Sequence, residues 1–264
     1  MKWGAVVPSR LRPAIIWAGV ALLLGGCAEH LAHFPTASPG ASVTVSGSLL
    51  RPEGTGPLPA MVVLHHCAGI TEVITDWGLW LRSEGYVTLM VNSFAARGRT
   101  RNTCATWVNP TPEEVALDAF GALAYLRSLP FVDKDRIGVI GWSYGALASL
   151  LASGDSFVSQ VRPEGGGFRA AVAFYPQCSY LSPATSIPVL LLLGGADYWS
   201  QPGVCGDRAE HLQRAGTPIV LKVYPGARHA FDDRTRPPQY DAPAAADAPK
   251  QLRAFLAQYV RGAR

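Results

Sequence analysis

The chain has 264 residues, of which 48% are hydrophobic and 16% are charged. This length suits one large α/β domain or two small domains, and the apolar content excludes wholesale disorder and a coiled coil. Residues 1–26 hold three basic residues and no acidic one, so the rest of the chain has only 20 basic against 19 acidic residues. A body this close to neutral lacks the positive surface that binds phosphate backbones, and nucleic acid is therefore not an expected partner.

The first 26 residues have the pattern of an export signal. A basic segment precedes an uncharged apolar run at 14–26, which is too short to span a bilayer as a helix. The run ends at Leu24-Gly25-Gly26-Cys27, which resembles the lipobox of bacterial lipoproteins, where cleavage exposes a cysteine for acylation. We therefore expect a signal peptide, a lipid on Cys27, and anchoring in the cell envelope at the periplasmic face of the outer membrane. Ordinary secretion to the periplasm and an uncleaved anchor are the alternatives.

The segment at 27–42 is polar and contains proline, which is typical of a tether. One folded domain is expected at 43–264. Of the five cysteines, four remain if Cys27 is acylated, an even set that an oxidising compartment would pair as disulfides. Their spacing does not match zinc sites, in which two cysteines lie within about four residues.

After residue 43, strand-like and helix-like segments alternate. The stretch Thr111-Pro112-Glu113-Glu114 predicts a helix start, with threonine as N-cap and a glutamate that closes a capping box. The expected strands are 43–50, 60–64, 86–91, 137–140, 170–174, 189–193 and 219–224, and the expected helices are 76–84, 111–128, 144–153, 204–215 and 249–260. This order, with uniformly apolar strands, predicts an α/β fold whose mostly parallel sheet has helices on both faces.

A nucleophile elbow is predicted at Gly141-Trp142-Ser143-Tyr144-Gly145, between a buried strand and a helix. Such a turn needs glycine on both sides, because only glycine tolerates the close contacts, and it exposes the serine hydroxyl. It also directs the Tyr144 amide, at the helix N-terminus, toward the oxygen of a bound carbonyl.

A nucleophilic serine needs a base, and the base needs a group that orients it. Asp197 and His229 each follow a later predicted strand, in the chain order Ser–Asp–His that such hydrolases use. Among the competitors, Asp232 and Asp233 follow His229 closely and are expected to be solvated loop acids.

The strand at 60–64 ends in His65-His66-Cys67. The loop after this strand is expected to supply the second oxyanion donor, the backbone amide of Cys67 or, as second choice, that of His66. Adjacent side chains on a strand point to opposite faces, so these three residues make a poor metal site and no metal is expected.

Several segments resemble the dienelactone hydrolase family of α/β-hydrolases. They are 61–69, 85–99, 133–145, 189–197 and 224–232, and they recur in order over nearly all of the mature chain. The resemblance implies the α/β-hydrolase fold and a triad of Ser143, Asp197 and His229. The family's namesake enzymes use cysteine as nucleophile, whereas this chain has Ser143, which favours a general carboxylic-ester hydrolase.

The resemblance also suggests disulfides Cys67–Cys104 and Cys178–Cys205, because all four residues would follow strands at one edge of the sheet. Trp142, Tyr144, Trp107 and Trp199 are candidates to line an acyl pocket, with packing as the alternative role. Arg97 is a candidate to bind a substrate carboxylate, with a solvated side chain as the alternative.

These features predict a lipid-anchored serine esterase that acts on a small-molecule ester through an acyl-enzyme and needs no cofactor. A peptidase or amidase with the same triad is one alternative. A non-catalytic envelope binding protein on a hydrolase scaffold is another. The sequence predicts neither the acyl and alcohol groups nor the oligomeric state.

Overall fold

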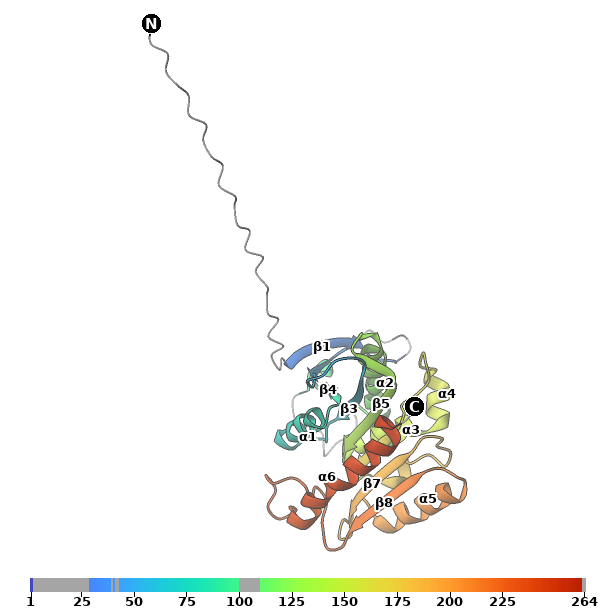
Figure 1. The fold of residues 1–264 in the computed structure, drawn as a ribbon. Helices are drawn as coiled ribbons and strands as arrows, with labels where there is room; N and C mark the ends of the chain where they lie inside the picture. Colours follow the sequence, from blue (N-terminus) through green and yellow to red (C-terminus); the bar gives the residue numbers. More distant parts are fainter. Residues whose placement is uncertain (2–28, 39, 41–42, 100–109, 263–264) are drawn as a thin grey trace.

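An eight-stranded sheet runs through the molecule in the order β1-β2-β4-β3-β5-β6-β7-β8 (Figure 1). In this computed structural model, residues 1, 29–38, 40, 43–99 and 110–262 are described. The strands are β1 Glu29–Pro35, β2 Thr44–Leu50, β3 Leu58–Leu64, β4 Val87–Asn92, β5 Val132–Trp142, β6 Ala171–Phe174, β7 Val189–Gly194 and β8 Ile219–Tyr224. β1 pairs antiparallel with β2, and β2 pairs antiparallel with β4, whereas every pair of neighbouring strands from β4 to β8 in the described part of the sheet is parallel. The predicted α/β fold with a mostly parallel sheet is confirmed.

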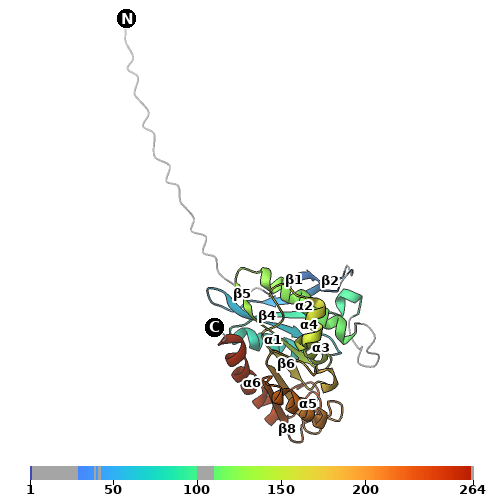
Figure 2. The ribbon, with the colours of Figure 1, turned by 90° about the vertical axis from the view of Figure 1, so that its right-hand side faces the viewer.

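Helices cover both faces of the sheet (Figures 1 and 2). They are α1 Glu72–Ser83, α2 Pro112–Ser128, α3 Tyr144–Ser153, α4 Asp155–Val161, α5 Pro202–Arg214 and α6 Ala242–Leu256, with short turns η1 Ala95–Arg97, η2 Cys178–Tyr180 and η3 Ala257–Arg261. Successive side chains of a strand point to opposite faces, so the core divides in two. One half packs with α1 and α6, and the other with α2, α3 and α5.

The start of α2 follows the sequence pattern. Thr111 Oγ1 accepts a hydrogen bond from the Glu114 amide at 3.2 Å, and Glu114 Oε2 accepts one from the Thr111 amide at 2.7 Å. The predicted capping box is therefore present, and it satisfies two amides that the first turn of a helix leaves without intrahelical acceptors.

The prediction of a tether at 27–42 is wrong for its central part, because Glu29–Pro35 forms strand β1. This strand pairs with β2 along its whole length, and Ala32 and Phe34 are buried while His33 is exposed. The alternation is that of an edge strand with one face on the core. Proline and histidine in this short segment hide the alternation in the sequence. The folded domain therefore includes residues 29–35, which the sequence assigns to the tether.

The last helix also starts earlier than predicted. Asp241 accepts a hydrogen bond from the Ala244 amide at 2.9 Å as N-cap, and Pro243 lies in the first turn, so α6 begins at Ala242 and Pro249 falls inside it. The start predicted from the sequence, at Pro249, is therefore wrong by about two turns of helix.

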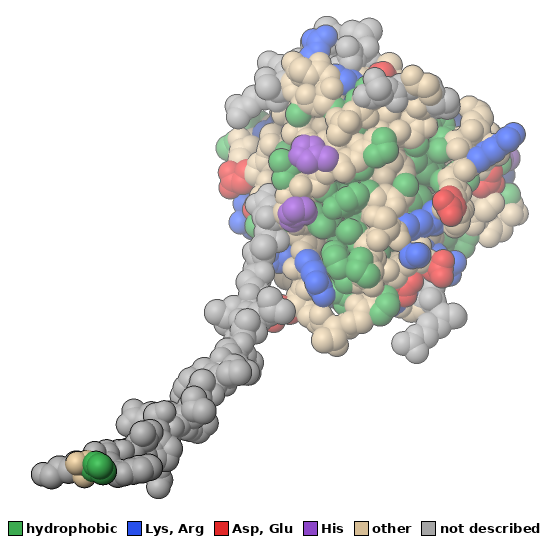
Figure 3. Space-filling view, turned by 90° about the horizontal axis from the view of Figure 1, so that it is seen from above, with side chains coloured by type: hydrophobic (Ala, Val, Ile, Leu, Met, Phe, Trp, Pro, Cys, Tyr) green, Lys and Arg blue, Asp and Glu red, His purple; other side chains and the backbone are tan. Residues whose placement is uncertain are grey.

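Basic and acidic side chains are interspersed on the face seen in Figure 3, and neither sign forms a continuous patch there. The predicted signal peptide at 1–26 and the predicted lipid attachment at Cys27 lie outside the described residues. Within the described ranges, no helix combines the length and the hydropathy required to cross a bilayer.

Candidate active site

Ser143 lies on a sharp turn between β5 and α3, as the motif predicts. Its backbone has φ 50°, in the left-handed region that residues other than glycine rarely adopt. A Cβ on Gly141 would lie 2.1 Å from the carbonyl oxygen of Gly145, and one on Gly145 would lie 2.3 Å from that of Leu64. Neither position can hold a side chain, which is the physical reason for glycine on both sides of the serine.

The three residues predicted as a triad come together at the carboxyl edge of the sheet. Ser143 Oγ lies 2.9 Å from His229 Nε2, and His229 Nδ1 lies 2.7 Å from Asp197 Oδ2. Because an ionised Asp197 only accepts, Nδ1 of His229 carries a proton and donates it to Asp197, which leaves Nε2 to accept the Ser143 hydroxyl proton. This is the hydrogen-bonded order that a serine nucleophile, its base and an orienting acid require.

Asp197 is buried and fully hydrogen-bonded. Its Oδ1 accepts from the amides of Trp199 (2.9 Å) and Ser200 (3.1 Å), and its Oδ2 accepts from the Ser200 hydroxyl (2.7 Å) as well as from His229. Burial acts to raise the pKa of Asp197, but the hydrogen bond and charge of His229 and the bonds from Ser200 outweigh burial, so this pKa is lowered. The carboxyl is therefore ionised at neutral pH.

This lowered pKa predicts how acid affects stability. An acid with a lowered pKa in the folded state stabilises the fold above its unfolded pKa, about 4, and loses that contribution as the pH falls through the folded value. Asp197→Asn removes the titrating group, so the free energy of unfolding should fall less steeply below about pH 4 in the variant than in the wild type. Urea unfolding at several pH values between 5 and 3 measures the two slopes, and equal slopes would contradict the prediction.

A small pocket opens beside the nucleophile, with a volume of about 50 Å³. It is lined by His66, Cys67, Ser143, Tyr175, His229, Ala230, Asp233 and Arg236. Burial, followed by the charges of His65 and Arg236, lowers the pKa of His66 to about 4, so its ring is neutral. His66 Nδ1 accepts the Ala68 amide at 3.1 Å, which places its remaining proton on Nε2, 2.8 Å from Thr71 Oγ1. His66 is thus held in one orientation and does not serve as a second base.

A larger cavity of about 300 Å³ lies between α1 and α6. Asp233 lines both it and the small pocket, but neither Ser143 nor His229 lines the larger one. We therefore assign the chemistry to the small pocket.

Arg97 does not have the role suggested by the sequence. Its Nη1 and Nη2 donate to the two oxygens of buried Asp118 at 2.8 and 3.2 Å, and Nη1 also donates to the Ser93 carbonyl at 3.0 Å. This bidentate pair occupies the guanidinium plane, so Arg97 holds η1 against α2 instead of binding a substrate. Arg236, which no motif in the sequence marks, is the basic residue on the small pocket.

The aromatic candidates divide into two groups. Trp142 is fully buried and packs on Phe174, with ring centroids 4.9 Å apart, so the prediction that it lines the pocket is wrong. As the last residue of β5 it points to the α1–α6 face. Tyr144 is buried as well, and its hydroxyl donates to the Pro110 carbonyl. Trp199, by contrast, lies beside the triad, with its ring in an edge-to-face arrangement with the His229 ring and the two ring centroids 4.7 Å apart.

The expectation that Asp232 and Asp233 are solvated is also wrong, because both are buried. Asp233 accepts hydrogen bonds from the amide and hydroxyl of Thr235, at 2.9 and 2.6 Å, and pairs with Arg236 at 3.2 Å. The loop after His229 packs against the core and buries both side chains, and their position in the sequence does not indicate this burial.

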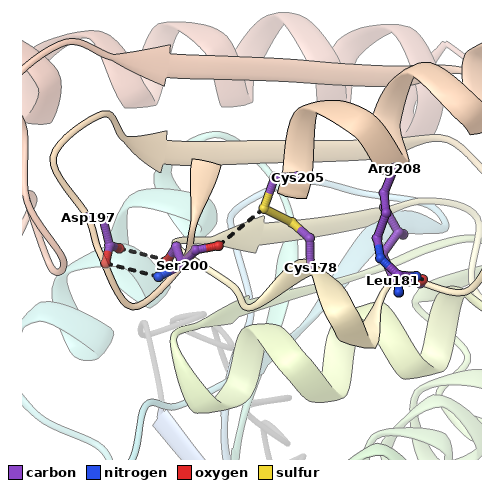
Figure 4. Close-up of a disulfide and its surroundings, with 6 residues drawn as sticks. All are labelled: Cys178, Leu181, Asp197, Ser200, Cys205 and Arg208. Carbon is purple, nitrogen blue, oxygen red and sulfur yellow. Dashed lines mark hydrogen bonds between the residues drawn. A yellow bond between two sulfur atoms is a disulfide. The ribbon is translucent and has the colours of Figure 1, made fainter. Parts of the chain in front are cut away.

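Of the two predicted disulfides, Cys178–Cys205 is confirmed (Figure 4). Cys67 is disulfide-bonded, but Cys104 lies outside the described residues, as does Trp107, so the Cys67–Cys104 pairing stays a prediction. In the described part of the chain, no group of three or more His, Cys, Asp or Glu side chains is arranged to hold a metal ion.

Known proteins resemble this chain in sequence and in fold. A model of the dienelactone hydrolase family matches residues 45–260. A Bradyrhizobium protein named "Probable 2-oxo-3-(5-oxofuran-2-ylidene)propanoate lactonase" is 27% identical over 206 residues, covering 71% of this chain and 79% of that protein.

Two solved structures show the same fold. The dienelactone hydrolase of Anabaena variabilis is 21% identical, covers 89% of this chain and 99% of its own, and has a TM-score of 0.66. Esterase 2 of Thermogutta terrifontis is 15% identical, covers 87% and 94%, and has a TM-score of 0.65.

Proposed function

Because the chain belongs to the dienelactone hydrolase family and carries a hydrolase fold, we propose that it is a serine hydrolase that cleaves carboxylic esters through an acyl-enzyme. The observation that supports this most directly is the hydrogen-bonded series Ser143–His229–Asp197 on the elbow. The namesake enzymes use cysteine, and serine at this position favours a general esterase. A serine hydroxyl is a weak nucleophile without a base, and His229 supplies that base.

The proposed reaction has two halves. His229 Nε2 takes the proton of Ser143 Oγ as this oxygen attacks the ester carbonyl, and the oxyanion is stabilised by the backbone amides of Tyr144 and Cys67. The protonated His229 then gives its proton to the leaving alcohol, which leaves an acyl group on Ser143. Water attacks the acyl carbon as His229 takes its proton, and His229 then returns this proton to Ser143 Oγ as the bond to the acyl group breaks and the acid is released. Neither half needs a metal or an organic cofactor.

The size of the pocket predicts a preference for short acyl chains. The described residues enclose only about 50 Å³ beside Ser143, so a long acyl chain clashes with the pocket walls unless it turns out into water, where it gains none of the ~0.8 kcal/mol that each buried CH₂ contributes. With p-nitrophenyl esters we expect kcat/KM for acetate or butyrate to exceed that for octanoate by about 10-fold or more. A rise in kcat/KM with chain length would contradict this, and turnover of a matched anilide would favour the amidase alternative.

A lactone that carries a carboxylate is a second candidate substrate. The Bradyrhizobium relative bears the name of a propanoate lactonase, and Arg236 places a cation on the pocket beside Ser143. Arg236→Gln should then raise KM for an acidic lactone by about 10-fold and leave KM for p-nitrophenyl acetate unchanged. Equal effects on both substrates would argue against a carboxylate contact.

We further propose that the mature protein is anchored in the cell envelope by a lipid on Cys27. The basic, apolar and lipobox-like segments of residues 1–27 support this location. Mass spectrometry of the native N-terminus should find an acylated Cys27, and Cys27→Ser should move the protein from the membrane to the soluble fraction. A native N-terminus beginning at Met1 would contradict the proposal, and cleavage near Ala28 without a lipid would favour ordinary secretion.

A further inference from the structure

A buried carboxylate lies behind the reaction centre. Asp232 is 9% exposed and follows His229 by three residues. Its Oδ2 accepts hydrogen bonds from the indole N–H groups of Trp77 (2.8 Å) and Trp142 (3.0 Å), and its Oδ1 lies 2.9 Å from the Tyr175 hydroxyl. An indole nitrogen can only donate, so Oδ2 is the acceptor for both indole groups, one from α1 and one from β5.

These three partners come from different elements of the fold. Trp142 is the residue before Ser143 at the end of β5, Tyr175 follows β6 and lines the small pocket, and Trp77 belongs to α1. The Tyr175 ring stands edge-on to His229, with centroids 4.7 Å apart. Asp232 therefore joins the strand of the nucleophile, the wall of the pocket and the loop of the base in one hydrogen-bonded group.

We propose that Asp232 is a positioning residue for the esterase reaction: it holds the His229 loop and the Tyr175 ring in register with Ser143. The inference rests on the proposed function, and it assigns a role to a residue that does not touch the reacting atoms. A placement error of even ~1 Å between base and nucleophile can cost about 10²-fold in rate, so a group that fixes this placement acts on kcat.

The burial of Asp232 supports the same role. Burial raises the pKa of this carboxyl, although the hydrogen bonds from Trp77, Tyr175 and Trp142 oppose the rise. Removing a carboxyl group from water costs free energy on folding, and an apolar side chain at the same buried position often gives a more stable protein. Its place between the strand before Ser143, the pocket wall at Tyr175 and helix α1 is therefore explained better by geometry at the site than by stability.

Four variants separate positioning from simple packing. In Asp232→Asn the amide oxygen still accepts both indole bonds and the amide nitrogen donates to the Tyr175 oxygen, so kcat for p-nitrophenyl acetate should stay within about threefold of wild type. Asp232→Leu keeps the number of side-chain heavy atoms and the branching at Cγ but loses all three bonds, so kcat should fall about 10²-fold with KM changed by less than about threefold.

Two further variants each remove one donor to the same carboxylate and form a matched pair. Tyr175→Phe affects the ring against His229 and should lower kcat about 10-fold, whereas Trp77→Phe, on α1 and away from the small pocket, should lower the melting temperature with little change in kcat. Assays run below the melting temperature of every variant, and the rate of Ser143 modification by a fluorophosphonate should follow kcat.

A folded Asp232→Leu variant with wild-type kcat would overturn the proposal, as would equal kcat in Tyr175→Phe and Trp77→Phe. If Asp232→Leu does not fold, the matched pair decides. Wild-type turnover and labelling of Ser143 test the proposed function separately, because only ratios of variant to wild type bear on Asp232. A wild type without either activity would overturn both.

Discussion

Ser143→Ala should lower kcat for a short-chain ester by at least ~10³-fold, to the residual level that oxyanion binding alone supports. The substitution removes only Oγ, whose hydrogen bond in the structure is to His229. It adds no backbone strain, because serine and alanine meet the same penalty at φ 50°. Loss of activity with an unchanged melting temperature therefore reports on chemistry and not on folding.

His229→Ala should be comparably severe, since the hydroxyl then has no base. Ser153→Ala is a matched control at the far end of α3, the helix that follows Ser143: Ser153 is buried, and its hydroxyl donates to the Leu150 carbonyl at 2.7 Å, but it does not line the small pocket. This variant should retain wild-type kcat. If Ser143→Ala kept most of its activity while His229→Ala lost it, the nucleophile would have to be another group and the acyl-enzyme at Ser143 would be wrong.

The parts of the fold and site that could be predicted are those with a local cause. The elbow depends on glycines within two residues of Ser143, and the start of α2 depends on a capping box within four residues. Asp197 and His229 could be placed because parallel strands end at one edge, so residues just after β7 and β8 must lie near each other.

The parts that could not be predicted depend on distant partners. Asp232 is separated from Trp77 by 155 residues, and nothing near either residue shows that the chain brings them within 2.8 Å. The sequence suggests Arg97 as a substrate contact, because it does not show that Arg97 pairs with Asp118 in α2, 21 residues away. A side chain's role follows from its neighbours, and sequence shows neighbours only where they are close in the chain or repeat with a regular period.

The Cys178–Cys205 disulfide is expected to stabilise the fold and to support the triad acid at the same time. It closes a loop with a sequence separation of 27, which in the chain-entropy model corresponds to about 3.5 kcal/mol. Replacing both cysteines with serine should therefore lower the melting temperature by roughly 7–14 °C for a domain of this size. Calorimetry of the two proteins under non-reducing conditions measures the difference.

Ser200 connects the disulfide to Asp197 (Figure 4). Cys205 Sγ contacts the Ser200 carbonyl oxygen at 3.6 Å, and the amide and hydroxyl of Ser200 both bond to Asp197. Without the bridge, the segment between Asp197 and α5 is held less firmly, so the carboxylate orients His229 for a smaller fraction of the time. We expect kcat to fall about 10-fold at a temperature where both proteins are folded, with KM little changed.

A second variant separates the bridge from general loosening of this region. Arg208 Nη1 donates to the Leu181 carbonyl at 2.8 Å and fastens α5 to the same segment that carries Cys178, but the bond lies farther along the helix from Asp197 (Figure 4). Arg208→Gln should cost about 1–2 kcal/mol of stability and leave kcat within about twofold. If the double serine variant lost stability but kept wild-type kcat, the bridge would serve the fold alone. If Arg208→Gln lowered kcat as much as the loss of the disulfide, the fall in kcat would be due to looser packing of α5. The contact between Cys205 and Ser200 would then not contribute to it.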